Sequence, residues 1–325
     1  MPIFRAAVAP QRRQLIAGVV FSLIAVAACG LVGQRLTHSS WPLAHARVVL
    51  VVGAALCYFA SFVLRARGWH RLFPRDQRPD QARCLASVGA AAASGAVLPF
   101  RLDYIIKVGM LRRLGGIRIG LEAIALSIIS LGMVDAVAML PLSISATATS
   151  SSSLRGPLLI VVAFGVGCCA LLVASDQLVR LPLLRRSRHF RAAAEHVCEH
   201  KTRQGRGSAI VAGFYLLGCW TTRAVGSVLL LSALGLSFSP TTALCVLCLS
   251  AAAGVVPITA GGAVANAGAT AGILLALGAG KDIAINFSLA SGMLLVTCAA
   301  VAAFSGVVLS LATRALARRP AIAGG

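Results

Sequence analysis

Two ionisable residues lie deep inside apolar stretches of the sequence. Arg223 follows Trp220-Thr-Thr within the run 210–235, and Asp135 lies within the run 117–141. Charged side chains are costly in hydrocarbon and are usually retained there because they bind a partner or a substrate. Arg223 therefore has two compatible roles, an ion pair with Asp135 or a contact with an anionic ligand. Asp135 is also the only obvious candidate for a proton carrier.

A second group of polar residues follows Pro99. Arg101 could hold a phosphate through two parallel hydrogen bonds, and Lys107 could act on the same phosphate as a point charge. Asp103 could serve as their internal counter-ion. The alternative is a basic helix that rests on the anionic lipids of a membrane surface.

A third group lies at a glycine-rich break after Pro257. Gly261 and Gly262 would leave backbone amides accessible, and Asn266 adds one polar side chain. Such a concave arrangement of amides suits an anion, although close packing of helices explains the glycines equally well. The substrate-binding residues that we expect are thus Arg101, Asp103, Lys107, Asp135, Arg223, Gly261, Gly262 and Asn266.

No motif in the sequence indicates catalysis, a metal site or a cofactor. The segment His196-Val-Cys-Glu-His200 has the H-x-x-E-H pattern of one metalloprotease class, but it lacks a third ligand and is expected to form a solvated amphipathic helix. The C-x-x-C pair Cys245 and Cys248 lies in an apolar run, where cysteine acts as a small hydrophobic residue. There is no P-loop and no dinucleotide fingerprint. We therefore expect no enzyme activity and no ATP site.

The composition defines the environment of these residues. Of the 325 residues 58% are hydrophobic and 12% are charged, and the mean hydropathy is +0.88. Soluble domains contain about 25% charged residues, so the composition excludes a soluble or disordered protein. The formal net charge of +21 would suggest nucleic acid as a partner of a soluble protein. In a membrane protein we expect membrane lipids as partners and no nucleic acid.

Six apolar runs are long enough to cross a hydrocarbon core of about 30 Å. They cover approximately residues 15–33, 46–64, 117–141, 157–175, 210–235 and 283–312. Two further apolar regions, 84–113 and 241–278, are interrupted near their middle by Pro99 and by the segment 257–262. Proline and glycine break helices at such points.

The basic residues favour hairpins over crossings in these two regions. If 84–113 crossed completely, its own basic residues would lie outside, against the positive-inside rule. If it instead enters and leaves on the cytoplasmic side, that side holds every Lys and Arg except Arg35, Arg47, Arg155, Lys281 and the intramembrane Arg223. Both termini and the basic loop 176–208 are then cytoplasmic.

This topology contains an internal repeat of opposite orientation. Residues 15–145 and 157–312 each comprise two spans, a hairpin and a third span, within a single membrane domain, 1–325. The expected fold class is an all-α polytopic membrane protein with six transmembrane helices and two re-entrant hairpins arranged as an inverted repeat. Paired interrupted segments often mark the binding site of a transporter. The alternative is a pair of kinked packing helices with no substrate.

Two segments resemble those of a known family. The stretch Leu98-Pro-Phe-Arg101-Leu-Asp103-Tyr-Ile-Ile-Lys107 is similar to the Pro-x-Arg-x-Gly-Glu/Asp-x-x-Arg element of the lysylphosphatidylglycerol synthase transmembrane-region family. Pro257-Ile-Thr-Ala-Gly-Gly262 resembles the family's Pro-x-x-Pro-Gly-Gly element, which usually continues to a Glu. The resemblance extends over about residues 15–312. Departures at Asp103, Tyr104, Lys107, Gly132, Ala260 and Asn266 or Ala267 indicate a divergent member.

The resemblance implies a flippase-like protein of a bacterial cytoplasmic membrane. The expected function is a lipid translocase that moves a polar, anionic headgroup across the bilayer. One alternative is a secondary transporter of a small solute or ion. Another is a non-transporting accessory protein whose partner is a membrane glycosyltransferase or a lipid synthase. The sequence leaves the lipid, the direction of transport and the oligomeric state open.

Overall fold

The structure is a computed structural model that describes residues 43, 46–96, 98, 102–114, 119–150, 152–178, 207–235, 240–255 and 262–318. Within these ranges all regular elements are helices, and no strand is found. The predicted all-α class is therefore confirmed for the part of the chain that the structure describes. The segment His196–His200 and the predicted first span, 15–33, lie outside the described residues.

Five helices are long and apolar enough to cross a membrane. They are α2 (Val48–Arg71), α5 (Leu121–Thr149), α6 (Ser152–Leu178), α9 (Ser208–Ala233) and α12 (Lys281–Arg318). Each coincides with one of the apolar runs predicted from the sequence. Their outer faces remain rich in exposed aliphatic and aromatic side chains, for example Ile160, Phe164 and Val173 of α6. Because such faces require a lipid environment, the chain is a multi-pass membrane protein.

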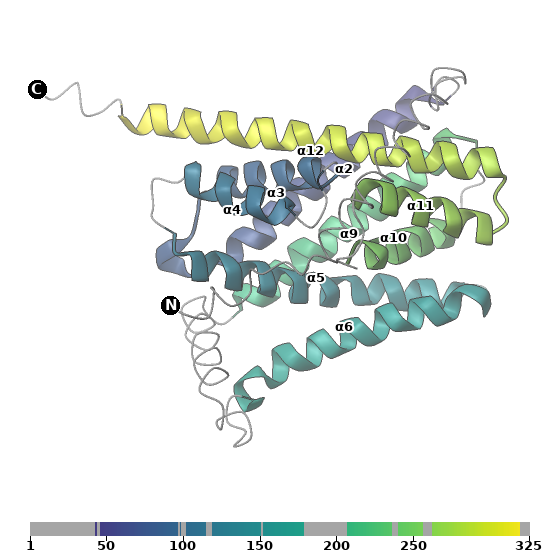
Figure 1. Cartoon of the computed structure of the whole chain (residues 1–325), viewed down its shortest axis with the longest axis horizontal. Coiled ribbons are helices and arrows are strands. Elements are labelled where there is room, and N and C mark those ends of the chain that lie inside the picture. Colours follow the sequence, from purple (N-terminus) through teal and green to yellow (C-terminus); the bar gives the residue numbers. More distant parts are fainter. Residues whose placement is uncertain are drawn as a thin grey trace, which may run out of the picture.

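Four shorter helices form two pairs where the sequence predicted interrupted segments. The first pair is α3 (Gln81–Gly95) and α4 (Asp103–Arg113), and the second is α10 (Pro240–Val255) and α11 (Gly262–Ala276). At a rise of 1.5 Å per residue each helix is about 16–24 Å long, too short to cross a core of about 30 Å. The two pairs lie at opposite ends of the long helices (Figure 1).

The helices of the two halves pack in corresponding ways. The helices that precede the two pairs, α2 and α9, lie along each other at the centre. The first pair packs through α3 against α12, and the second packs through α10 against α5. In the same manner α5 packs against α9, and α12 packs against α2. Every contact in this set has a counterpart in the other half.

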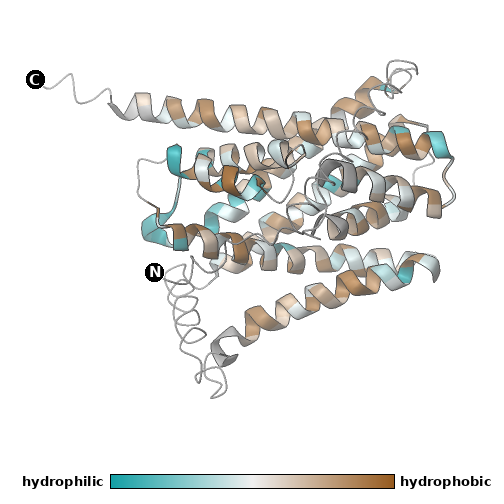
Figure 2. Cartoon of the chain, viewed as in Figure 1, coloured by the Kyte–Doolittle hydropathy of each residue, from teal (hydrophilic) through white to brown (hydrophobic). Residues whose placement is uncertain are grey.

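Hydrophilic residues are concentrated at the two ends of the helices, with a few inside the bundle (Figure 2). One end carries the last turns of α2 and α4, with Arg71, Arg112 and Arg113. The opposite end carries the starts of α2 and α12, with Arg47 and Lys281. We call the first of these the basic end, and the pair α3–α4 enters the bundle from it.

Candidate functional site

An ion pair joins α2 to α5 inside the bundle. An Nη of Arg65 donates to one carboxylate oxygen of Asp135 at 2.6 Å. The indole Nε1 of Trp220 in α9 donates to the other oxygen at 2.8 Å. The side chains of Arg65 and Asp135 are 22% and 13% exposed, and Asp135 lies at the middle of α5. Side chains of α2 and α9 thus bind a carboxylate that belongs to α5.

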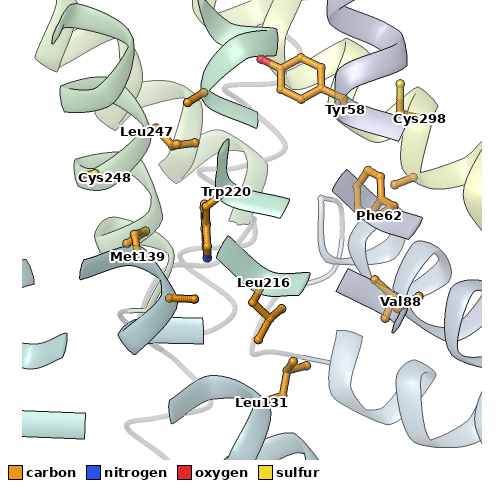
Figure 3. Packing of buried hydrophobic residues seen from close by; sticks show 14 of the residues in the cluster. Tyr58, Phe62, Val88, Leu131, Met139, Leu216, Trp220, Leu247, Cys248 and Cys298 are labelled. Atoms are coloured by element: carbon orange, nitrogen blue, oxygen red, sulfur yellow. The ribbon is translucent and has the colours of Figure 1, made fainter. Parts of the chain in front are cut away.

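Arg223 lies beside this pair but is bound differently. Its Nε donates to the hydroxyl of Ser61 at 3.1 Å. Its guanidinium carbon lies 5.3 Å from the ring centroid of Phe62 and 5.3 Å from that of Trp220, in the range of cation–π contacts. In the view of Figure 3, Trp220 lies between Phe62 of α2 and Met139 of α5. Among the described residues no carboxylate is within ion-pair distance of Arg223.

Lys107, in α4 of the first pair, contributes a third cation. Its Nζ lies 4.3 Å from the ring centroid of Trp69, and the residue is 8% exposed. The backbone carbonyl of Lys107 accepts a hydrogen bond from the hydroxyl of Ser87 at 2.6 Å, which ties α4 to α3. Trp69 is itself fixed, because its Nε1 donates to the hydroxyl of Ser127 at 3.1 Å. As with Arg223, no described carboxylate pairs with the Lys107 ammonium.

These three cations follow one face of α2. Arg223 lies at Ser61 and Phe62, Arg65 follows one helical turn later, and Lys107 lies at Trp69, one turn later again. One turn is about 5.4 Å. We call Arg223, Arg65 and Lys107 the cation row. Because Ser61 lies about 15 Å from the end of α2, the row leads from the basic end to roughly half the depth of a bilayer.

The structure thus brings together three of the predicted site residues, Lys107, Asp135 and Arg223. Asp103 begins α4 one turn before Lys107, but it is not within ion-pair distance of that residue. Gly262 is the first residue of α11. Arg101 and Gly261 lie outside the described residues.

Asn266 lies in α11, away from the helices that carry the cation row. Its Oδ1 is buried and has no hydrogen-bond partner among the described residues. The helix α11 packs against α10 and α12, whereas the row is built on α2, α4 and α9. Among the described residues, the structure therefore shows no contact between Asn266 and the row.

The proposed pairing of Arg223 with Asp135 is wrong. Asp135 pairs with Arg65, a residue that the positive-inside pattern predicted to lie on the cytoplasmic side. The reason is the length of α2, which continues to Arg71 instead of ending near residue 64. Arg65 and Trp69 are therefore helical residues one turn apart, and both were missed. That spacing was the signal in the sequence that could have identified them.

A bundle of membrane-spanning helices that encloses cations near its middle defines the class of this molecule: a polytopic membrane protein with a charged interior. The chain matches the family described as lysylphosphatidylglycerol synthase TM region over residues 14–296 and belongs to that family. The suspected resemblance is thereby confirmed. No curated protein and no solved structure matches the chain.

Proposed function

We propose that the protein is a lipid translocase that moves a polar, anionic headgroup across a bacterial cytoplasmic membrane. The observation that carries the proposal is the cation row, in which Arg65, Lys107 and Arg223 are accompanied by a single paired carboxylate, Asp135. An unpaired anion is prohibitively costly in hydrocarbon. Cations that lie inside the bundle could replace the water that the headgroup loses.

The way in which Arg223 is held supports an anionic ligand. Phe62 and Trp220 lie against the guanidinium and Ser61 accepts from Nε. Among the described residues only the Nε–H of Arg223 has a hydrogen-bond acceptor, so its terminal N–H groups remain available to an anionic ligand. Arginine binds phosphate or carboxylate through two such parallel N–H groups. The acyl chains could meanwhile remain in the surrounding lipid.

The proposed mechanism is alternating access between two inverted halves. The corresponding packing of α2 with α9, of α3 with α12 and of α10 with α5 supports such a repeat, and so does the position of the two helix pairs at opposite ends. In the complete proposal there are six spans, the first at 15–33, and both pairs are re-entrant. Rocking of the two halves would expose the row to each side in turn. The basic end and both termini would be cytoplasmic.

The proposal is tested with purified protein in liposomes. Fluorescent phosphatidylglycerol in the outer leaflet should become inaccessible to an external quencher faster than in protein-free liposomes, and phosphatidylcholine should not. Arg223→Gln should abolish the difference, whereas Arg67→Gln, an exposed position on α2, should not. Movement of a soluble anion without movement of lipid would instead indicate a small-solute transporter. If neither moves, the translocase is refuted and an accessory role beside a lipid-modifying enzyme or a glycosyltransferase is favoured.

Lys107→Met should separate function from stability. The methionine keeps most of the stem that packs in this 8% exposed position and removes a charge that forms no ion pair with a described carboxylate. Replacing a buried charge by an apolar side chain is often neutral or stabilising, so the free energy of unfolding should stay unchanged or rise by about 1 kcal/mol. Lipid movement should nevertheless be lost. Thermal denaturation in detergent and the liposome assay measure the two effects. Normal transport by this variant would remove Lys107 from the site.

A further inference from the structure

Among the described residues, the one carboxylate that forms an ion pair with the cation row does so at its middle position. Asp135 binds Arg65, with Lys107 one turn of α2 toward the basic end and Arg223 one turn deeper. An anion that moves along the row must pass this carboxylate. We propose that Asp135 takes the place of a substrate phosphate on Arg65, and that a phosphate-bearing headgroup binds by displacing it. This inference rests on the proposed function.

The geometry of the pair is that of a bound oxyanion. The two oxygens of Asp135 accept separate hydrogen bonds, at 2.6 Å from Arg65 and at 2.8 Å from Trp220. Both donors come from the central helices α2 and α9, while the carboxylate comes from α5. The donors therefore form a site that would remain if the Asp135 side chain turned away. Two oxygens of a phosphate would meet the same two donors.

The charges on either side of Asp135 favour the exchange. Lys107 and Arg223 have no carboxylate partner among the described residues, so the row carries excess positive charge at both of its ends. A headgroup that reaches Lys107 is attracted, but Asp135 repels it from Arg65 because like charges at short range are unfavourable, most of all away from water. Displacement of Asp135 converts this barrier into a binding position. The carboxylate would thus prevent anions from passing unless they bind well enough to replace it.

Phosphate suits this exchange better than a carboxylate does. It offers more acceptor oxygens, and arginine binds it through two parallel hydrogen bonds. Because the α2 positions that contact or carry neighbouring cations of the row are about one helical turn, or about 5.4 Å, apart, we infer that a single phosphate can contact Arg65 while it still contacts Lys107. A ligand that bridges two cations can move from one to the next without losing all of its partners.

The test is equilibrium binding of short-chain phosphatidylglycerol to the full chain in nanodiscs of phosphatidylcholine. Asp135→Asn removes the competing charge but keeps an oxygen that can accept from Trp220. This variant should bind the lipid about tenfold more tightly than the wild type, since a charge-assisted hydrogen bond no longer has to be broken. Glu122→Gln, which removes an exposed carboxylate of the same helix, is the matched control and should bind as the wild type does. The gain should vanish in Arg65→Gln/Asp135→Asn.

A second variant covers the case in which Asp135→Asn does not fold. Trp220→Phe keeps an aromatic face beside Arg223 and removes one of the two hydrogen bonds to Asp135, so the lipid should bind about threefold more tightly. Unchanged or weaker binding by the variants that fold would overturn the inference. So would a gain seen with inorganic phosphate but not with the lipid, which would make the ligand a soluble anion. Tighter lipid binding by the variants in a protein that moves no lipid in liposomes would support the exchange and refute the proposed function.

Discussion

Glutamine in place of Arg65 should destabilise the protein strongly and stop lipid movement. The substitution leaves the carboxylate of Asp135, 13% exposed, with only the hydrogen bond from Trp220. Removing one partner of a fully buried ion pair costs about 3–5 kcal/mol. Because Arg65 is 22% exposed, the lower end applies, and we expect the free energy of unfolding to fall by about 3 kcal/mol. Thermal denaturation in detergent measures this effect.

Two further variants separate the structural role of Arg65 from its functional role. Arg67→Gln removes a charge two residues away on the exposed face of α2 and should change the free energy of unfolding by less than about 0.5 kcal/mol. Arg65→Gln/Asp135→Asn removes both charges and should regain most of the stability, because the two effects are strongly coupled. The double variant should still move no lipid. If it transports normally, Arg65 has only a structural role, and the cation row is not the site.

The spans and the interrupted segments could be predicted because hydropathy and helix-breaking residues act locally. A helix in lipid satisfies its own backbone hydrogen bonds, so an apolar run of sufficient length is almost enough to define a span. Pro99 and the segment 257–262 likewise separate the helices of the two pairs wherever those pairs lie in the bundle. Which pair packs on which long helix depends on contacts between distant segments, and the sequence did not provide these.

The site could be predicted only in part, because local sequence features identify some of its residues whereas others depend on contacts between distant segments. Asp135 and Arg223 are conspicuous because each is a charge deep inside an apolar run, and Lys107 belongs to a motif. Arg65 was missed because it begins a series of arginines that continues with Arg67 and Arg71, and such a series is typical of a cytoplasmic loop. Only the helical register of α2 shows that Arg65 faces Asp135 while Arg67 faces outward.

The site is less symmetric than the packing. The first pair of helices supplies Lys107 to the cation row, whereas the second pair offers Asn266, whose Oδ1 is buried without a partner among the described residues. Helix pairs that correspond in the two halves thus carry side chains of different charge. This asymmetry places the charged part of the site on the side of the basic end, from which a headgroup would enter.

Alanine in place of Gly306 should disrupt the packing of α3 against α12, which holds the first pair of helices in place. An added Cβ at Gly306 of α12 would collide with the backbone nitrogen of Ala86 and lie 2.6 Å from the carbonyl oxygen of Ala82, both in α3. Reciprocally, a Cβ at Gly89 of α3 would lie 2.6 Å from the carbonyl oxygen of Ala299 in α12. Backbone atoms cannot rotate aside as side chains do, so the two helices must separate. Overpacking of this kind costs about 1–3 kcal/mol, and we expect the upper end.

Gly292→Ala is the matched control, because the same change in the same helix meets no described atom within 4 Å. There the gain in helix propensity should leave the free energy of unfolding unchanged or raise it by up to about 1 kcal/mol. Thermal denaturation should therefore find Gly306→Ala less stable than the wild type and Gly292→Ala at least as stable, and equal stabilities would show that α3 and α12 are not in backbone contact. Because Ser87 of α3 binds the carbonyl of Lys107, a displaced α3 should also carry Lys107 away from Trp69. Gly306→Ala should then weaken lipid binding as well, although no atom of Gly306 belongs to the cation row.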